Sequence, residues 1–439
     1  MFKFFRPHVS FACQKLQTLK SPLSSSSQIS CRVTSLPSTC IHQEQQQQQR
    51  KYSRNEQHVS LNSSIDENSS HHRVVFSGIQ PTGNLHLGNY LGAVKNWVTL
   101  CNDDLSTKRQ IESLIHPKDK ENQRPSSIPL NQASSNAPLF HEKFFCVVDL
   151  HAITMPQDPK ALRESSVNLI AMLLACGLDP NKCSLFFQSQ IPAHSQLSWI
   201  LGCFITENRL KRMHHYKDKK TENSSIGLVS YPVLMSADIL LYSLKGNELY
   251  IPVGDDQRQH LELAQEVAQQ MNFKFEGLFD VPRGIYPPHA YRVMSLRDGT
   301  KKMSKSDTSD MSRINIVDSD DLIAQKIKKA KTDALTELTY DKEKRPEVAN
   351  LIDIYAALQG KTAEEVVQMY SSITENVNSK FKHDLAEIVV QAIKPIRENY
   401  NRYLNDPQFI QQVVTRGSER ANEVTQKALR QIMDRVGFY

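Results

Sequence analysis

One short run in the second half of the chain combines residue types that suit phosphate chemistry. Lys302, Met303, Ser304, Lys305 and Ser306 follow one another there. Lysine ammonium groups can neutralise a polyphosphate, and serine hydroxyls can add hydrogen bonds to it. Short charged runs are more often solvated surface. The run alone therefore indicates a phosphate site without deciding for one.

A second candidate segment lies far upstream. Residues 74–76 are apolar and typical of a buried strand, residues 77–83 contain two glycines, and residues 89–100 have helical spacing. A strand, a glycine turn and a helix N-terminus together form an anion and nucleotide site. The glycine turn alone is more simply an ordinary loop. The two segments together favour nucleotide binding.

The remaining apolar runs predict the elements that would position these loops. Residues 144–148 and 184–188 read as buried strands and residues 162–176 as a helix, and this alternation is typical of a parallel sheet covered by helices. The pattern from 195 to 242 is helical, with a basic interruption. Beyond the lysine-serine run the chain is helical throughout, with a capping box at Thr362 and a cap at Asp406 before a proline. The fold class is therefore α/β, with a Rossmann-like parallel sheet and an α-helical C-terminal domain.

The chain is 439 residues long, enough for two or three domains, and its formal net charge of +6 is compatible with a nucleic-acid partner. Residues 1–43 contain basic residues and many serines but no Asp or Glu, which is typical of a mitochondrial or plastid transit segment. A merely disordered tail is the alternative. We expect residues 1–72 to be a transit peptide followed by a disordered polar stretch, and residues 103–140 to be a low-complexity insertion.

Cysteine spacing and hydropathy exclude some classes of protein. The 8 cysteines form no C-x-x-C pair, so we expect neither a zinc site nor a disulfide framework. Cys146 and Cys176 sit in apolar runs and are most simply buried thiols. No apolar stretch of about 18 residues occurs, so we expect no membrane span.

Residues 77–89 and 302–306 resemble the HIGH and KMSKS signatures of class I aminoacyl-tRNA synthetases. Residues 147–154, 231–240 and 253–257 are similar to segments of the tryptophanyl-tRNA synthetases of bacterial and organellar type, and the resemblance runs from about residue 73 to the C-terminus. It implies activation of L-tryptophan by ATP and transfer of the tryptophanyl group to tRNA(Trp), with Mg²⁺ bound to the phosphates of ATP. It further implies a catalytic domain over 73–311, an anticodon-binding domain over 312–439, and a homodimer.

The resemblance also assigns roles to single residues. The expected catalytic residues are Lys302, Ser304, Lys305, His86 and Asn89. Besides Asn89 and the three residues of the lysine loop, the expected ATP-binding residues are Gln80, Pro81, Thr82, Gly88, Gly254, Asp255, Asp256, Val293, Met303, Ser306 and Lys219. The expected tryptophan-binding residues are Asp238, Met235, Tyr231, His151, Gln257, Phe76 and Gly78. No residue of the chain is expected to hold a metal.

Asp238 carries the physical argument for substrate choice. Apolar neighbours surround it in the sequence, which favours a buried carboxylate over a surface or capping one. A buried carboxylate can accept the single N–H of an indole, and a ring without that donor would leave the acceptor unpaired. His151 follows an apolar strand on the usual ligand side, although a structural histidine is as good an interpretation from the residues alone.

Two alternative functions stay open at this point. A tyrosine–tRNA ligase shares the fold and both signatures, and a catalytically inactive tRNA-binding relative would share the fold alone. An intact set of motif residues favours an active enzyme. For localisation we expect the mitochondrial matrix ahead of a plastid.

Overall fold

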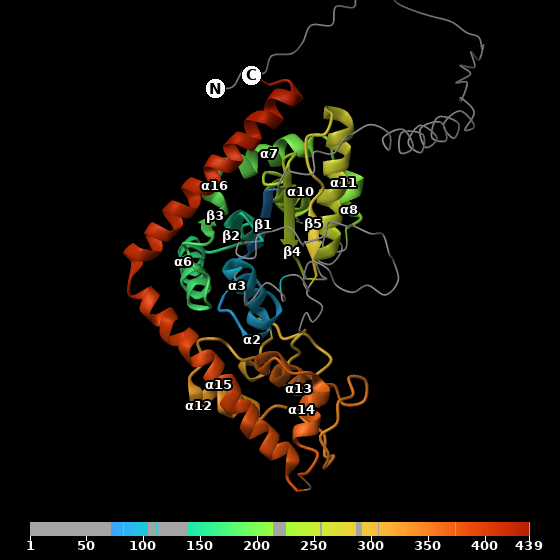
Figure 1. Cartoon of the computed structure of the whole chain (residues 1–439), viewed down its shortest axis with the longest axis vertical. Coiled ribbons are helices and arrows are strands. Elements are labelled where there is room, and N and C mark those ends of the chain that lie inside the picture. Colours follow the sequence, from blue (N-terminus) through green and yellow to red (C-terminus); the bar gives the residue numbers. More distant parts are fainter. Residues whose placement is uncertain are drawn as a thin grey trace, which may run out of the picture. The chain divides into compact units, whose positions relative to one another are not determined.

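The structure is a computed structural model that describes residues 72–81, 83–103, 111, 139–213, 225–254, 257–286, 292–305, 307–373 and 375–438. All of them belong to one compact unit, Ser70–Tyr439. The predicted transit peptide and polar stretch, residues 1–72, lie outside the described residues except for His72, which begins the first strand. The described part contains both the sheet and the C-terminal helices (Figure 1).

A five-stranded parallel sheet forms the centre of the N-terminal part. Its strands are β1 (His72–Ile79), β2 (Glu142–Val147), β3 (Ser184–Phe187), β4 (Asn247–Pro252) and β5 (Arg283–Ile285). Their order in the sheet is β3-β2-β1-β4-β5, and every pairing is parallel. The three predicted strands are confirmed, whereas β4 and β5 were not predicted. The strand order changes direction between β1 and β4, and ligands bind at such a switch point in open α/β sheets.

Side chains alternate between the two faces of the sheet and build two apolar cores. In β2, Phe145 and Val147 join one core, while Phe144 and Cys146 join the other. Both faces are covered by helices, which explains why these strands are continuous apolar runs rather than alternating ones. Cys146 and Cys176 are buried thiols, as predicted.

The helices are divided between the two faces. The first core packs against α3 (Lys95–Asn102) and α6 (Pro159–Ala175). The second packs against α7 (Pro192–Gly202), α10 (Ile226–Leu240) and α11 (Arg258–Phe275), with the short α8 (Glu207–Lys211) beside α10. The predicted helix at 89–100 is built from α2 (Leu87–Asn89), a π-helical turn (Tyr90–Val94) and α3.

The C-terminal part is helical, as predicted. It contains α12 (Asp320–Lys328), α13 (Pro346–Gln359), α14 (Ala363–Met369), α15 (Val377–Leu404) and α16 (Pro407–Val436). Thr362 opens α14 with a capping box, and the side chain of Asp406 caps α16 ahead of Pro407, which confirms both predicted helix starts.

The last helix returns to the sheet and covers its β3 edge (Figure 1). Gly417 packs so closely on β3 that an added Cβ would lie 2.0 Å from the carbonyl oxygen of Leu185. Ser418 donates to Gln190 Oε1 at 2.5 Å, and Arg420 pairs with Glu142. Covering an edge strand removes a site for unwanted pairing. The helical region is therefore partly built onto the part that contains the sheet, and the predicted boundary at 311/312 stays a prediction.

The predicted insertion at 103–140 lies mostly outside the described residues. Those of its residues that are described, at its ends and at Ile111, belong to the fold. Asp103, Ile111, Leu139 and Phe140 are all buried, and Asp103 accepts a hydrogen bond from the Phe140 backbone at 2.8 Å. Among the described helices, none is both long enough and apolar enough to cross a bilayer.

Candidate active site

The carboxyl end of the sheet brings the first predicted loop into position. β1 ends at Ile79 and β4 at Pro252, so residues 78–80 and Gly254 lie at the switch point. Gly78 is exposed there, and an added Cβ would lie 2.8 Å from Val148 of the next strand's end. A larger residue at position 78 would have to displace that neighbour, so glycine keeps this edge open to a ligand.

His86 and Asn89 form a capping box at the start of α2. The His86 Nδ1 atom accepts a hydrogen bond from the Asn89 backbone at 3.3 Å, and Asn89 Oδ1 accepts one from the His86 backbone at 3.3 Å. Burial, followed by the charges of Lys305, Lys302 and Arg313, lowers the pKa of His86 to about 4. The imidazole is therefore neutral at physiological pH. Only its Nε2 atom is left free of the capping box to meet a ligand.

The lysine loop closes against this first loop from across the sequence. Lys305 Nζ donates to the Gly83 carbonyl at 3.2 Å, and burial lowers the pKa of Lys305 to about 8. Gly83 has a φ of +60°, which glycine adopts without strain. The predicted pairing of the two segments is thereby confirmed in space. Lys302 and Lys305 are both close enough to His86 for their charges to lower its pKa.

The lysine loop ends a short hairpin. Met294 and Lys302 face each other as an antiparallel pair, flanked by hydrogen bonds from Ser295 to Lys301 at 2.8 Å and from Met303 to Val293 at 3.0 Å. Val293 and Met303 are 3% and 2% exposed, so their side chains belong to the core. Their contact with ATP stays a prediction.

Glycine at position 88 lets the first loop and the hairpin approach each other. An added Cβ would lie 3.1 Å from the His86 ring and 3.5 Å from Val293 Cβ. The segment around Ile314, which follows the hairpin in the sequence, contacts the first loop as well, because the Leu87 backbone N–H donates to the Ile314 carbonyl at 2.8 Å. Loop, hairpin and segment form one layer over the carboxyl end of β1.

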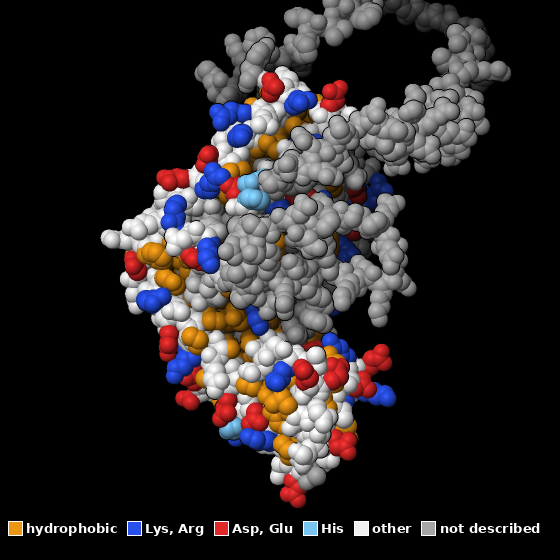
Figure 2. All heavy atoms as spheres, viewed as in Figure 1, with side chains coloured by type: hydrophobic (Ala, Val, Ile, Leu, Met, Phe, Trp, Pro, Cys, Tyr) orange, Lys and Arg blue, Asp and Glu red, His pale blue; other side chains and the backbone are white. Residues whose placement is uncertain are grey.

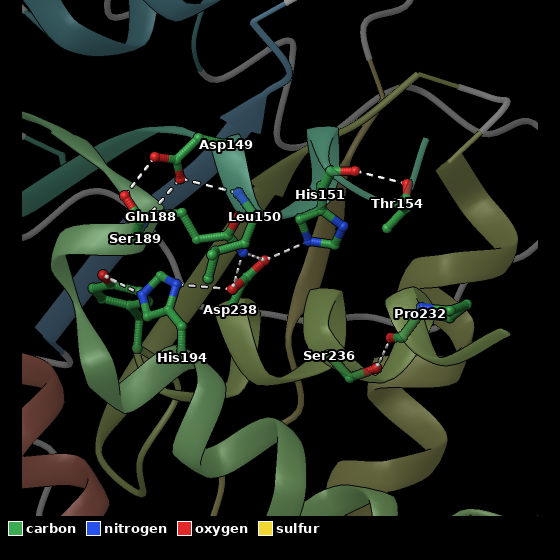
Figure 3. Close-up of polar contacts among 11 residues, drawn as sticks. Asp149, Leu150, His151, Thr154, Gln188, Ser189, His194, Pro232, Ser236 and Asp238 are labelled. Atoms are coloured by element: carbon green, nitrogen blue, oxygen red, sulfur yellow. Dashed lines mark hydrogen bonds and ion pairs between the residues drawn. The ribbon is translucent and has the colours of Figure 1, made fainter. Parts of the chain in front are cut away.

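A separate cluster of side chains surrounds one buried carboxylate (Figure 3). Asp238 of α10 is 2% exposed, as the sequence argument predicted. His151 Nε2 lies 2.9 Å from its Oδ2, His194 Nδ1 lies 2.8 Å from its Oδ1, and Gln188 Nε2 lies 2.8 Å from both oxygens. Burial alone would raise the pKa of Asp238. The two histidines outweigh burial and hold that pKa well below its usual range.

Three elements at the carboxyl ends of neighbouring strands supply these partners. His151 lies in α5 (Asp149–Ala152) after β2, Gln188 begins the 3-10 turn Gln188–Gln190 after β3, and His194 lies in the first turn of α7. Asp149 fixes the two strand ends together by accepting from the Ser189 backbone at 2.9 Å. Because parallel strands end at the same edge, residues far apart in sequence converge on one carboxylate.

Three other residues predicted to bind tryptophan lie on α10 or on β1. Tyr231 lies at the cluster: its ring meets the His151 ring edge-on at 6.1 Å, and its hydroxyl lies 3.0 Å from His260 Nε2. Burial raises the pKa of Tyr231 to about 12. Met235 is half-buried on α10. Phe76 is buried in the second core, where it stacks on Tyr242 at 4.8 Å and meets the ring of His194 edge-on at 6.5 Å, and its contact with tryptophan stays a prediction.

Five of the expected residues lie outside the described residues, namely Thr82, Lys219, Asp255, Asp256 and Ser306. Three others are described. Gln257 is half-buried at the start of α11, where its backbone donates to Gly254 at 2.9 Å. Gln80 is exposed and Pro81 buried at the end of β1.

Sequence reasoning missed Gln188 and His194. A glutamine at a strand end and a histidine in a helix have no distinctive spacing. The only available signal was the position of Gln188 at the carboxyl end of a predicted strand, the edge where ligands bind.

Known proteins with similar sequences agree with the function that this geometry suggests. A family model described as tRNA synthetases class I (W and Y) matches residues 68–111 and 128–394. The tryptophan–tRNA ligase of Rickettsia bellii is 41% identical over 370 residues, which is 83% of this chain and 99% of that protein. The chain belongs to the tryptophan–tRNA ligase family. It is therefore an aminoacyl-tRNA ligase, and the predicted family is confirmed.

Solved structures of the family have the same architecture. The tryptophanyl-tRNA synthetase of Mycoplasma pneumoniae superposes with a TM-score of 0.64 at 30% identity, covering 84% of this chain and 98% of that one. The tryptophanyl-tRNA synthetase of Campylobacter jejuni, solved with ADP and tryptophan, superposes with a TM-score of 0.63 at 29% identity, covering 83% and 100%. The predicted Rossmann-like α/β fold with a helical C-terminal region is confirmed.

Proposed function

We propose that the chain is an organellar tryptophan–tRNA ligase. It activates L-tryptophan with ATP to tryptophanyl-adenylate and transfers the tryptophanyl group to tRNA(Trp). The observation that carries this proposal is the meeting of the lysine loop and the first loop at the switch point, on the same edge as the Asp238 cluster. The family membership and the likeness to a solved relative that holds ADP and tryptophan support it.

The nucleotide side of the site supplies positioning and charge rather than covalent chemistry. Attack of the tryptophan carboxylate on the α-phosphorus forms the adenylate and expels pyrophosphate, so negative charge on the leaving group must be neutralised. Lys302 and Lys305 lie where they can do this, and Ser304 adds a hydrogen-bond donor. His86, neutral because its pKa is about 4, donates or accepts without adding charge. The open backbone at Gly88 makes room for the adenine.

Magnesium enters this proposal on the phosphates of ATP, because Mg²⁺ binds readily through phosphate oxygens and water. Among the described residues, one group could hold a metal by its ligand types: His383, Asp384 and Glu387 on α15. Asp384 already pairs with Lys380 at 2.7 Å. The proposed reaction uses neither that group nor a zinc ion.

The amino-acid side selects a ring that donates a hydrogen bond. An ionised carboxylate offers about four lone pairs, and three side chains already lie within 2.9 Å of the two oxygens of Asp238. An indole N–H therefore competes with these partners for a lone pair. Gln188 and His194 are both 0% exposed, whereas His151 is 6% exposed and faces Tyr231. We infer that the indole takes the Oδ2 position from His151, while Gln188 and His194 hold the carboxylate still.

The helical region is proposed to read the anticodon, as its counterpart does by family resemblance. On the face shown in Figure 2, described Lys and Arg side chains are interspersed with Asp and Glu over this region. A mixed surface of this kind favours recognition by particular contacts rather than by one broad basic field. Once the adenylate is formed, proximity to the tRNA terminal hydroxyl supplies much of the rate of transfer.

Two further parts of the proposal concern assembly and location. Trp199, Ile226 and Phe273 are 77%, 85% and 79% exposed on α7, α10 and α11, which pack together. Large exposed apolar side chains on neighbouring helices support a homodimer formed through this surface. The basic, serine-rich residues 1–43 without Asp or Glu support import into the mitochondrial matrix, with a plastid as the alternative.

ATP–pyrophosphate exchange tests the proposed reaction directly. The full-length chain and a chain starting at residue 70 are each assayed with tryptophan, tyrosine and phenylalanine. Exchange that depends on tryptophan alone is the expected result. Exchange driven by tyrosine would favour the other amino acid of the family, and folded protein without exchange would favour a tRNA-binding relative without catalysis.

A further inference from the structure

The outer edge of the lysine hairpin carries backbone N–H and C=O groups that need hydrogen-bond partners. Met294 and Lys302 form the non-hydrogen-bonded pair of the hairpin, because the flanking hydrogen bonds run from Ser295 to Lys301 and from Met303 to Val293. In such a pair, the backbone N–H and C=O of each residue point away from the partner strand. The backbone groups of Met294 therefore point out of the hairpin, and buried groups of this kind need partners.

One side chain of the helical region supplies both partners. Asn350 of α13 accepts from the Met294 backbone N–H through Oδ1 at 2.7 Å, and its Nδ2 donates to the Met294 carbonyl at 3.0 Å. A primary amide carries one donor and one acceptor side by side, so it copies the backbone of a neighbouring strand. Asn350 acts here as a one-residue third strand along the hairpin.

The surroundings of Asn350 show that the amide is not there for packing. Asn350 is 3% exposed, and the flanking Ala349 and Leu351 of α13 are buried apolar residues. A leucine at position 350 would continue this apolar pattern. An amide in an apolar environment is stabilising only while its hydrogen bonds are made.

A second contact fixes the same hairpin to the same helix. Gly299 lies in the hairpin turn, and an added Cβ there would lie 2.5 Å from the Glu347 backbone nitrogen and 2.6 Å from the Pro346 carbonyl carbon. The turn therefore rests on the first turn of α13, while Asn350 holds the strand one helical turn further on. α13 thus contacts the hairpin at its turn and at its strand, in addition to the backbone hydrogen bonds that join Leu296 to Ser312 and Lys331.

We propose that Asn350 is a positioning residue for ATP: by fixing Met294, it sets where Lys302 and Lys305 stand over the phosphates. This inference rests on the proposed activation of tryptophan by ATP. Asn350 itself contacts neither substrate. Its loss lets the hairpin shift, and that weakens the binding of ATP and pyrophosphate while the Asp238 cluster, built from other elements, keeps its affinity for tryptophan.

The test compares Asn350 with a matched side chain elsewhere in the chain. Asn272 of α11 makes the same double contact with the Phe279 backbone, donating at 2.7 Å and accepting at 2.7 Å. It lies near the end of α11 that is remote from Gly254. Asn272→Leu therefore removes an equivalent pair of hydrogen bonds without touching the hairpin. Asn350→Asp keeps the size and the acceptor but replaces the donor with an oxygen facing the Met294 carbonyl, and it serves if Asn350→Leu does not fold.

ATP–pyrophosphate exchange and thermal unfolding are measured on the full-length chain. We expect the KM for ATP and for pyrophosphate to rise about tenfold in both Asn350 variants, since the two hydrogen bonds that hold the hairpin are together worth a factor of that order. The KM for tryptophan should stay within about twofold, and Asn272→Leu should lose similar thermal stability with an unchanged KM for ATP. An unchanged KM for ATP in a folded Asn350 variant overturns the inference. So does an equal rise in Asn272→Leu. If the unaltered chain shows no tryptophan-dependent exchange, the proposed function has failed instead.

Discussion

Lys305 makes ATP binding depend on pH in a way that the structure specifies. Burial lowers the pKa of Lys305 to about 8, and its Nζ atom donates to the Gly83 carbonyl at 3.2 Å. A bound triphosphate favours the charged ammonium, so binding ATP restores the proton to Lys305. The affinity contributed by that charge is fully present below pH 8 and is lost as the pH rises above it.

The size of the effect follows from a single titration. If only the protonated lysine holds the triphosphate, the KM for ATP rises about twofold at pH 8 and about tenfold at pH 9, because one pKa unit corresponds to about 1.36 kcal/mol. His86 does not add to this slope, since its pKa of about 4 keeps it neutral throughout the range. The KM for tryptophan should change little, because Asp238 stays ionised.

The assay is ATP–pyrophosphate exchange between pH 7 and 9.5, with the KM for ATP and for tryptophan determined at each pH. Lys305→Arg is the matched control, because a guanidinium stays charged over this range. Its exchange rate is expected to be lower, but its KM for ATP should not rise between pH 8 and 9. A flat profile in the unaltered chain refutes the assignment, and so does the same rise in Lys305→Arg.

Three other substitutions have defined outcomes. Asp238→Asn should lower the free energy of unfolding by about 3 kcal/mol and weaken selection for tryptophan, because the charge at the centre of a buried cluster is lost. Chemical denaturation measures the first effect, and pyrophosphate exchange with tryptophan, tyrosine and phenylalanine measures the second. In the unaltered chain, the stability that this charge adds should be present above pH 4 and decline below it. Lys326→Met should cost about 3 kcal/mol as well, since Lys326 is 0% exposed and bridges Asp318 at 2.6 Å and Asp310 at 2.7 Å, and a loss under about 1 kcal/mol would contradict this. Trp199→Glu should convert the proposed dimer to a monomer in light scattering, whereas an unaltered mass would place the interface elsewhere.

The parts of the fold with local signals were predictable. Continuous apolar runs marked β1, β2 and β3, and the caps at Thr362 and Asp406 marked helix starts, because each signal lies within a few residues. β4 and β5 escaped prediction. β4 opens on Asn247 and Glu248, and β5 on Arg283 and Gly284, so polar residues or glycine stand where the predicted strands have continuous apolar runs.

The candidate site divides in the same way. Asp238 could be predicted to be buried, because its apolar neighbours are adjacent in sequence. Gln188, His194 and Asn350 could not be recognised, since each gains its meaning only when distant strands or helices meet. Phe76 was assigned to tryptophan by family resemblance, and only the register of β1 shows that its side chain lies in the second core.

Formation of the adenylate in a single turnover tests the central claim most directly. The full-length chain is mixed in excess with labelled ATP and either tryptophan or tyrosine, and the product is separated by chromatography. The account predicts close to one tryptophanyl-adenylate per functional site and no tyrosyl-adenylate. No adenylate with tryptophan, or equal yields with both amino acids, would contradict it.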